Sequence, residues 1–383
     1  MRYDGIVIGG GAAGMFAAIT AAKRGQNVLL LEKNDRLGRK LLITGKGRCN
    51  VTNNCTGQEV LQNVPRNGRF LYSAMTAFPP EKTMAFFEER GCRLKTERGN
   101  RVFPVTDKSQ SILDCLQSEL HRQKITVKTA RVRDILTQDG HVTGVRTQNE
   151  EIAANWVILA TGGYARNKDM VARYPVAHYF SNVPHGNVGD GLTAAEKLGA
   201  RNFEHPAVQV VYTSLTNGVG INDESGLIVN DRGERVVNEW SYQYTVSDAI
   251  ARSGSNCGWY ITSGKEPYGG VQYGYKAAVA GKSKDPCAAS IEGLAKKMGC
   301  DPATLQATYD RYGELVERGV DEDFGKPAEF LHPIKGPKFV ALRLHPCVTV
   351  TFGGLETDIS ARVMKPDGSV IPHLYAAGEV AGT

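Results

Sequence analysis

The sequence predicts an α/β fold that begins with a Rossmann-like βαβ unit. Residues 3–8 form a short apolar run of strand type, and residues 12–24 are rich in alanine with apolar residues at helical spacing. A second apolar run, 28–31, ends in the acidic residue Glu32. Strand, helix, strand and terminal acid in this order are typical of a unit that holds a dinucleotide.

The turn between the first strand and the helix carries the spacing G-x-G-x-x-G at Gly9, Gly11 and Gly14. Gly9 lets the chain turn sharply, Gly11 lets the backbone approach a pyrophosphate, and Gly14 lets helix and strand pack closely. Ala12 and Ala13 open the helix, whose N-terminal N–H groups and partial positive charge suit that anion. The motif alone would also fit an ordinary glycine-rich turn. With the strand, the helix and the acid in place it predicts dinucleotide binding, with these five residues as contacts.

The acid at the end of the second strand restricts the nucleotide. Glu32, which Lys33 follows, can accept hydrogen bonds from both hydroxyls of a ribose and would repel a 2′-phosphate. The chain has one such fingerprint, at its N-terminus. In flavoproteins with that arrangement the first βαβ unit holds the ADP half of FAD, and other segments reach the flavin.

Two later segments have the character needed to reach a flavin. "WVILATGG" (156–163) and "PHLYAAGEVAG" (372–382) are short strands followed by small residues, which let the backbone pass close to a cofactor. Each taken alone also fits a central strand with a tight turn. Together with the N-terminal unit they favour FAD over NAD. The candidate contacts in them are Ala160, Thr161, Gly162, Gly378 and Glu379.

Composition limits the other classes of function. The formal net charge of +6 is small for 383 residues, and the basic residues are scattered among 40 acidic ones. We therefore expect no nucleic-acid partner. The eight cysteines form no C-x-x-C pair, which favours free thiols over zinc or disulfides, and we expect no metal site. No signal peptide and no apolar run of membrane-spanning length is evident. We therefore expect a cytoplasmic protein of two domains with no membrane span.

The chain resembles two families of flavoproteins, and the change falls at the "ATGG" segment that both share. Residues 1–163 resemble the BaiN-like (YhiN-like) bacterial FAD flavoproteins through "GRKLLITGKGRCNVTN" (38–53), "PRNGRFLYSA" (65–74) and "ERGNRVFPVTDKS" (97–109). Residues 164–383 resemble the flavoprotein subunit of soluble fumarate reductases and related FAD-dependent enzymes through "NVGDGLTAAEKLGA" (187–200), "GLIVNDRGERVVNE" (226–239), "DEDFGKP" (321–327) and "TFGGLETD" (351–358).

These resemblances imply a Rossmann-like FAD-binding domain with a β-meander and an inserted α+β cap domain. The FAD-binding domain would occupy 1–204 and return at 346–383, and the cap would occupy 205–345. Relatives continue past the residue that matches Thr383 into a final helix, so we expect the return to be truncated. The pattern itself predicts a meander with a turn at Asp139–Gly140 and helices over 108–123 and 302–318.

The first resemblance places segment 38–53 against the pyrophosphate and the flavin. Its basic side chains suit phosphate and its glycines let N–H groups approach the ring, although a solvated surface is the alternative for each basic residue. The candidates in it are Arg39, Lys40, Thr44, Gly45, Lys46, Gly47, Arg48 and Asn50. By the second resemblance Asp190 contacts the cofactor and Glu379 lies near the ribityl chain. The alternatives are a plain Asp-Gly turn and a solvent-facing carboxylate.

The residues for catalysis come only from the fumarate reductase resemblance. His205 matches the histidine that binds a substrate carboxylate, but the proton-donating arginine falls on Gln243 and a second histidine falls on Val350. The family's threonine and glutamate fall on Gly218 and Val219. Fumarate is therefore not the expected substrate. Further polar candidates are Tyr242, Tyr244 and His345, of which Tyr244 is the candidate proton donor or acceptor; cap-domain packing is its alternative.

The function that follows is an FAD-dependent oxidoreductase. We expect hydride exchange between flavin N5 and an activated carbon–carbon bond of a small, fairly apolar molecule, with electrons from a separate donor or NAD(P)H. Two alternatives remain open at this point. One is a flavin oxidase or amine dehydrogenase, and the other is a non-catalytic or truncated FAD-binding protein.

Overall fold

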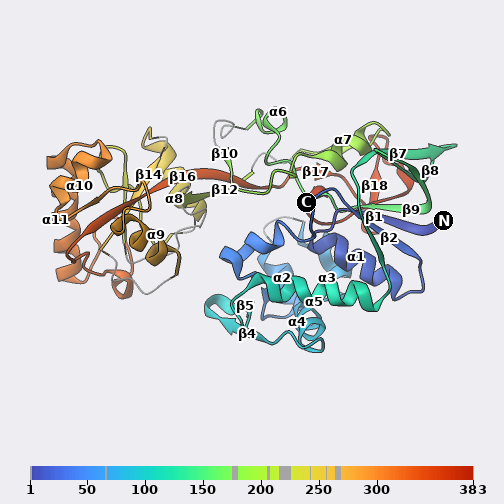
Figure 1. The fold of residues 1–383 in the computed structure, drawn as a ribbon, viewed down its shortest axis with the longest axis horizontal. Helices are drawn as coiled ribbons and strands as arrows, with labels where there is room; N and C mark the ends of the chain where they lie inside the picture. Colours follow the sequence, from blue (N-terminus) through green and yellow to red (C-terminus); the bar gives the residue numbers. More distant parts are fainter. Residues whose placement is uncertain are drawn as a thin grey trace. The chain divides into compact units, whose positions relative to one another are not determined.

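The computed structural model describes residues 2–64, 67–174, 180–204, 208–214, 226–241, 243–255, 257–263 and 269–382. The chain divides into two compact units. The first comprises Met1–Pro175, Val183–Val208 and Val350–Thr383, and the second comprises Val176–Asn182 and Gln209–Thr349. Figure 1 shows their elements in the colours of the sequence.

The core of the first unit is an eight-stranded sheet. Its main path runs in the order β18 (Arg362–Met364), β19 (Val370–Ala376), β9 (Glu151–Leu159), β1 (Tyr3–Ile8), β2 (Val28–Glu32) and β6 (Thr126–Thr129). Strands β19, β9, β1, β2 and β6 are parallel, and β18 is antiparallel to β19. The parallel strands end at one edge of the sheet, where the loops that follow them gather.

Two helices cover one face of this sheet. α1 (Ala12–Ala22) follows β1 and lies beside α5 (Ser109–Arg122), as Figure 1 shows. Buried side chains of α1, α5 and β2, among them Met15, Leu30 and Leu116, form one apolar cluster. The predicted βαβ unit and the helix at 108–123 are confirmed, because apolar periodicity in the sequence reports this buried face directly.

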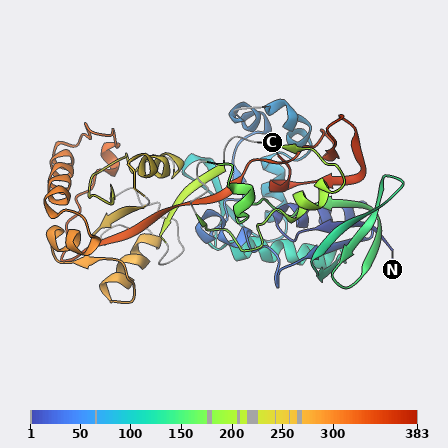
Figure 2. The same ribbon diagram turned by 90° about the horizontal axis from the view of Figure 1, so that it is seen from above.

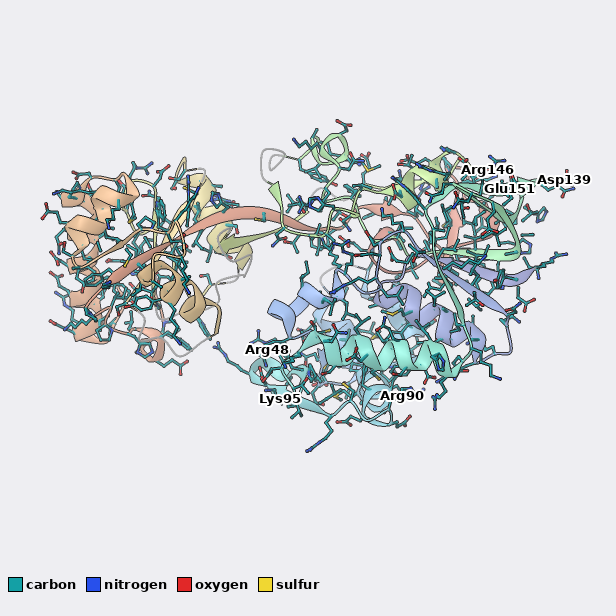
Figure 3. All side chains as sticks on the ribbon, viewed as in Figure 1. Arg48, Arg90, Lys95, Asp139, Arg146 and Glu151 are labelled. Carbon is teal, nitrogen blue, oxygen red and sulfur yellow. The ribbon has the colours of Figure 1, made fainter. Side chains whose placement is uncertain are left out.

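The meander follows β6. β7 (Val132–Gln138), β8 (His141–Thr147) and β9 pair antiparallel in chain order. Asp139 and Gly140 both have positive φ, 48° and 77°, as a two-residue hairpin turn of the left-handed kind requires. Figure 2 shows the meander beside the N-terminus, and Figure 3 labels Asp139 at its tip. The ring of Trp156 on β9 covers Gly5 so closely that a Cβ at Gly5 would lie 2.0 Å from it.

The remaining elements of the first unit are short. A three-stranded sheet in the order β3 (Thr52–Asn53), β5 (Arg101–Pro104), β4 (Leu94–Glu97) follows the 3-10 turn η1 (Leu41–Gly47). The helices are α2 (Gly57–Asn63), α3 (Tyr72–Ala77), α4 (Pro80–Glu88), α6 (Lys168–Val171) and α7 (Asp190–Glu196). β11 (Asn202–Phe203) pairs with β17 (Gly354–Leu355), and the other 3-10 turns are η2 (Gly68–Leu71), η3 (Arg98–Asn100) and η5 (Gly378–Val380).

Glu119 of α5 ties this helix to the end of α4. Its side chain is 2% exposed and accepts hydrogen bonds from Arg90 Nε at 3.0 Å and Gln123 Nε2 at 3.0 Å, and it pairs with Arg122 at 2.6 Å. Figure 3 labels Arg90, whose guanidinium also lies over the Phe86 ring. Burial by itself would raise the pKa of Glu119, but the hydrogen bonds from Arg122, Arg90 and Gln123 lower it to about 2.

We expect Glu119→Gln to lower the free energy of unfolding by about 2 kcal/mol at pH 7, because the charged hydrogen bonds are lost. The carboxylate stabilises the fold above its ordinary pKa of 4.5, and this stabilisation is lost as the pH falls toward 2. Urea unfolding of the two proteins should therefore differ at pH 7 and converge as the pH falls through this range. A constant difference down to pH 2 would contradict the prediction.

The second unit is built on a six-stranded sheet. Its path is β10 (Phe180–Ser181), β16 (Phe339–Thr351), β14 (Gly258–Thr262) and β13 (Leu227–Asn230), and both β12 (Val208–Ser214) and β15 (Cys287–Ala288) pair with β16. Its other elements are α8 (Gln243–Arg252), α9 (Gly269–Val279), α10 (Ile291–Met298), α11 (Pro302–Arg318) and the 3-10 turn η4 (Ala328–Phe330). The predicted caps of α11 are confirmed: Asp301 accepts from Thr304 N at 2.9 Å, and Gly319 is left-handed.

Four buried charges lie together in the second unit. Arg235 donates to both carboxylate oxygens of Glu239 and to both of Asp321, at 2.8–3.0 Å. The Lys326 ammonium lies 3.3 Å from Glu239 and donates to the carbonyl of Gly226. The side chain of Arg235 is 6% exposed, and those of Glu239, Asp321 and Lys326 are 0% exposed. We call these four residues the buried tetrad.

The limits of the two units differ from the predicted domain limits by four residues at 205–208 and at 346–349, and by a whole segment at 176–182. The sequence placed 176–182 in the FAD-binding domain, whereas this segment clusters with the second unit. The reason is that Phe180 and Ser181 pair in parallel with Cys347 and Val348 of β16. A partner strand so far along the chain leaves no local pattern that would reveal the pairing.

No described helix is both long and apolar enough to cross a membrane. All eight cysteines are free thiols. Burial raises the pKa of Cys115 to about 11, so this thiol stays protonated at neutral pH. The described residues contain no group of three or more His, Cys, Asp or Glu side chains that could hold a metal ion.

Candidate cofactor site

A pocket of about 460 Å³ lies in the first unit, where the parallel strands β2, β1, β9 and β19 end. This is the edge at which open α/β sheets bind their ligands. Of the predicted contacts, the pocket is lined by Gly9, Gly11, Ala12, Ala13, Glu32, Lys33, Arg39, Lys40, Thr44, Asn50, Ala160, Thr161, Gly162, Gly378 and Glu379. Gly14, Gly45, Gly47, Arg48 and Asp190 lie outside this lining.

The glycine turn has the geometry that its spacing predicts. Gly9 has a φ of +109°, and a Cβ there would lie 2.3 Å from the carbonyl oxygen of Ala160. A Cβ at Gly14 would lie 1.8 Å from the carbonyl oxygen of Gly9, so α1 can approach the turn only because residue 14 has no side chain. At Gly11 a Cβ would meet nothing within 4 Å, which leaves the backbone open to the pocket.

The start of α1 is suited to an anion. Gly11 is the N-cap residue and supplies no side-chain hydrogen bond to the first turn. The first N–H groups of the helix therefore face the pocket without a capping side chain, and they carry the positive end of the helix dipole. A phosphate group is the ligand that such a helix end binds most readily.

Glu32 is held in a defined orientation at the end of β2. Its Oε2 accepts from the backbone N–H of Gly10 at 2.7 Å, and its Oε1 accepts from the backbone N–H of Asn34 at 2.8 Å. Oε1 also accepts from the side-chain amide of Asn34 at 2.5 Å, so Oε2 is the oxygen that keeps a lone pair for a hydroxyl. This geometry fits a ribose next to the glycine turn.

Asp190 does not line the pocket itself but contacts Lys33, which does. It begins α7, pairs with the Lys33 ammonium, and accepts from Arg131 NH2 at 3.1 Å. Lys33 also donates to the carbonyl of Gly186 at 2.6 Å. The Asp190 carboxylate thus fixes the lysine that follows Glu32, and it lies at the helix end where a negative charge is stabilising.

Only some of the contacts predicted in segment 38–53 line the pocket. Arg39, Lys40, Thr44 and Asn50 line the pocket, and Arg39 also pairs with Asp35 at 3.3 Å. The side chain of Lys46 lies outside the described part of the chain. Gly45 has positive φ, and a Cβ there would lie 2.7 Å from the backbone nitrogen of Asn50. The glycine therefore permits the tight return of the chain that brings Asn50 to the pocket.

Arg48 was predicted to neutralise phosphate, but its guanidinium lies among carboxylates. It donates to Asp107 from Nε at 2.8 Å, pairs with Glu97, and lies over the ring of Phe103. Lys95 joins the same two carboxylates, and Figure 3 shows Arg48 and Lys95 side by side. Arg48 thus anchors the loop that precedes Asn50 to β4 and to the end of β5.

The loops after β9 and β19 provide the third side of the pocket. Gly162 and Gly378 have positive φ, 74° and 78°, and a Cβ at Gly378 would lie 2.7 Å from Ala13. The hydroxyl of Thr161 is buried without a hydrogen-bond partner among the described residues. A Cβ at Gly191 of α7 would lie 2.2 Å from this hydroxyl, so the protein covers it and it does not open to the pocket. These features fit a dinucleotide that passes close to the backbone.

The predicted catalytic residues are not tested by this geometry. His205 and Tyr242 lie outside the described residues, as do Gly218 and Val219. Gln243 and Tyr244 are the first two residues of α8 in the second unit, and their side chains lie outside the described part of the structure. Val350 lies on β16. His345, also on β16, is half-buried, and burial lowers its pKa with a further contribution from Arg343.

Several residues of the lining were missed by the sequence analysis. Asn187 lines the pocket and accepts from Ala165 N at 2.9 Å, and Gly186 and Pro184 lie beside it. The segment beginning at Asn187 was noted for its resemblance, but nothing in it pointed to this residue. Phe87 and Leu116 also line the pocket from helices, where apolar periodicity cannot separate a cofactor wall from a core.

The model of one protein family, described as "HI0933-like protein Rossmann domain", matches residues 3–382. The chain belongs to this family. The match includes both units and every residue of the pocket lining. The predicted fold class and its dinucleotide-binding N-terminus are thereby confirmed.

Three relatives show which proteins this HI0933-like chain is similar to. It is 28% identical to the NADH:fumarate oxidoreductase of Klebsiella pneumoniae over 99% of the chain, and it spans 44% of the length of that protein. It is 36% identical to the 3-dehydro-bile acid delta(4,6)-reductase of Clostridium scindens over 42% of the chain and 39% of that protein. The open conformation of a flavocytochrome c3 fumarate reductase matches 100% of the chain with a TM-score of 0.74 and 26% identity, over 73% of that structure.

Proposed function

We propose that this protein is an FAD-dependent oxidoreductase that exchanges a hydride with an activated carbon–carbon bond of a small molecule. The observation that carries the proposal is the pocket at the ends of β2, β1, β9 and β19, with an oriented carboxylate at one side and an open helix start at its centre. The family match and the named reductases among the relatives support the same chemistry.

The residues of the pocket suggest how FAD is held. Glu32 accepts hydrogen bonds from the adenosine ribose, and the backbone from Gly11 to Ala13 receives the pyrophosphate. The ribityl chain and the ring then pass along the loops after β9 and β19, where Gly162 and Gly378 let the backbone come close. When bound, FAD supplies a site that accepts or donates a hydride. The protein fixes the position of the bound FAD.

The substrate class is part of the proposal. Two of the relatives are named as an oxidoreductase of fumarate and as a delta(4,6)-reductase of a 3-dehydro-bile acid. By the resemblance to fumarate reductases, Gln243 and Val350 fall where that family has its acid and a carboxylate ligand, so we propose a less charged, fairly apolar substrate rather than fumarate. His205, Gln243 and Tyr244 remain the candidate substrate contacts, with Tyr244 as proton donor or acceptor. The closer kinship of 1–163 to the BaiN-like flavoproteins is likewise a proposal.

The electron donor is also a proposal. The Klebsiella pneumoniae relative is named for NADH, and this chain spans 44% of its length. We propose that NAD(P)H, or a separate donor protein, reduces the bound FAD. Anaerobic reduction followed by a screen of enoate, enone and steroid-like acceptors tests the proposal. Reoxidation by these acceptors is expected, whereas peroxide release in air without acceptor turnover would favour an oxidase.

We expect Glu32→Ala to weaken FAD binding by about 1–3 kcal/mol, because the ribose hydroxyls lose their acceptor. Titration of the apoprotein with FAD, followed by flavin fluorescence, measures the change. Glu151→Ala is the matched control: Glu151 is 58% exposed and pairs with Arg146 on the meander, as Figure 3 shows. Equal FAD affinity of both variants and the wild type would contradict the assignment of Glu32.

A further inference from the structure

One ion pair lies inside the pocket. The Lys40 ammonium is 2.6 Å from Oε2 of Glu379, and the two side chains are 28% and 16% exposed. Both residues line the pocket, Lys40 just before η1 and Glu379 within η5. A cation and an anion are therefore held next to each other at the place where a cofactor is expected.

The Glu379 carboxylate is fixed from its other side as well. Its Oε1 accepts from the backbone N–H of Thr351 at 3.1 Å. A Cβ at Gly163 would lie 2.7 Å from the same oxygen, so the backbone there also limits where the carboxylate can go. The carboxylate can leave this position only if the hydrogen bond to Thr351 breaks. It therefore holds the Lys40 ammonium at a defined point in the pocket.

The strand order shows which half of a dinucleotide reaches this pair. β2, which ends in Glu32, lies on one side of β1, and β9 and β19 lie on the other. Glu379 comes three residues after the end of β19. With the ribose at Glu32 and the pyrophosphate at the start of α1, the remaining half extends toward β9 and β19. This half is the ribityl chain and the flavin ring.

We propose that Lys40 and Glu379 set the reduction potential of the bound FAD in opposite directions. The inference rests on the proposed binding of FAD. A hydride donor supplies two electrons and one proton to the ring, which then carries one net negative charge. The Lys40 ammonium stabilises that charge. The Glu379 carboxylate destabilises that charge and also partly neutralises the lysine. The intact pair therefore keeps the reduction potential between the values expected with either charge alone.

The midpoint potential of bound FAD, measured by anaerobic reduction against a reference dye, tests the inference. Lys40→Met should lower the potential and Glu379→Gln should raise it. A shift of about 30 mV corresponds to a tenfold change in the ratio of the affinities for oxidised and reduced FAD, and we expect at least this much in each direction. Lys40→Arg keeps the charge and should stay near the wild-type value.

Two controls carry the same charge changes outside the pocket. Lys197→Met removes a 57% exposed lysine that pairs with Asp134, and Glu151→Gln removes a 58% exposed carboxylate. Both should leave the potential unchanged. For any variant that releases FAD during purification, the affinities for oxidised and reduced FAD are measured separately, and their ratio gives the same shift.

The outcomes separate this inference from the proposed function. Opposite shifts in Lys40→Met and Glu379→Gln support it. Shifts in the same direction, or none, in variants that bind FAD overturn it and leave the pair as a structural contact. A wild-type protein that binds no FAD overturns the proposed function itself, and the inference with it.

Discussion

Arg235→Met should lower the free energy of unfolding by about 3–5 kcal/mol, because it leaves two carboxylates of the buried tetrad without their main partner. Glu239 and Asp321 each accept two hydrogen bonds from this guanidinium, and both side chains are 0% exposed. Methionine fills a similar volume, so the loss measures charge pairing more than packing. Denaturant unfolding followed by circular dichroism measures the change.

The control for Arg235→Met lies in the same unit. Arg252→Met removes an 80% exposed arginine that pairs with Asp248 four residues away, and exposed pairs of this kind contribute little. The two variants should therefore differ strongly although the chemical change is the same. Similar stability of both variants would mean that the tetrad is not needed to hold the second unit together.

Gly14→Ala should reduce FAD affinity by a factor of at least about 100, which corresponds to about 2.7 kcal/mol. The added methyl group would lie 1.8 Å from the carbonyl oxygen of Gly9, so α1 must move away from the turn and its N–H groups move away from the pyrophosphate. Overpacking of this kind also lowers stability, typically by about 1–3 kcal/mol. Titration with FAD and thermal unfolding of the apoprotein measure the two effects.

Gly313→Ala gives the matched comparison for this change. Gly313 lies within α11, and a Cβ there would meet nothing within 4 Å. Alanine is favoured over glycine inside a helix, so this variant should gain about 0.5–1 kcal/mol and keep the FAD affinity of the wild type. Wild-type affinity in Gly14→Ala would mean that the glycine turn does not contact the cofactor.

Much of the fold could be predicted because its signals are local. The first βαβ unit, the meander turn at Asp139–Gly140 and the caps of α11 each depend on residues within a few positions of one another. Periodicity and turn chemistry report such features directly. The same holds for Gly9 and Gly14, whose spacing alone predicts that backbone atoms come close.

The rest of the site depends on partners that are distant in the sequence. Arg48 looked like a phosphate ligand in a basic segment, and only the folded chain brings Glu97 and Asp107 to its guanidinium. The pairing of Lys40 with Glu379 is of the same kind, because η1 and η5 meet only at the edge of the sheet. A sequence shows which side chains carry charge, but the tertiary fold decides which charges neutralise one another.

The placement of the three tryptophans gives each unit its own optical reporter. Trp156 covers Gly5 in the first unit, whereas Trp240 and Trp259 belong to the second, where Trp240 stacks on Phe330 with ring centroids 3.8 Å apart. The tryptophan fluorescence of a variant without Trp156 therefore reports on the second unit alone. The difference between its fluorescence and that of the wild type reports on the first unit. Melting curves recorded on both would reveal whether the units denature in one transition or in two.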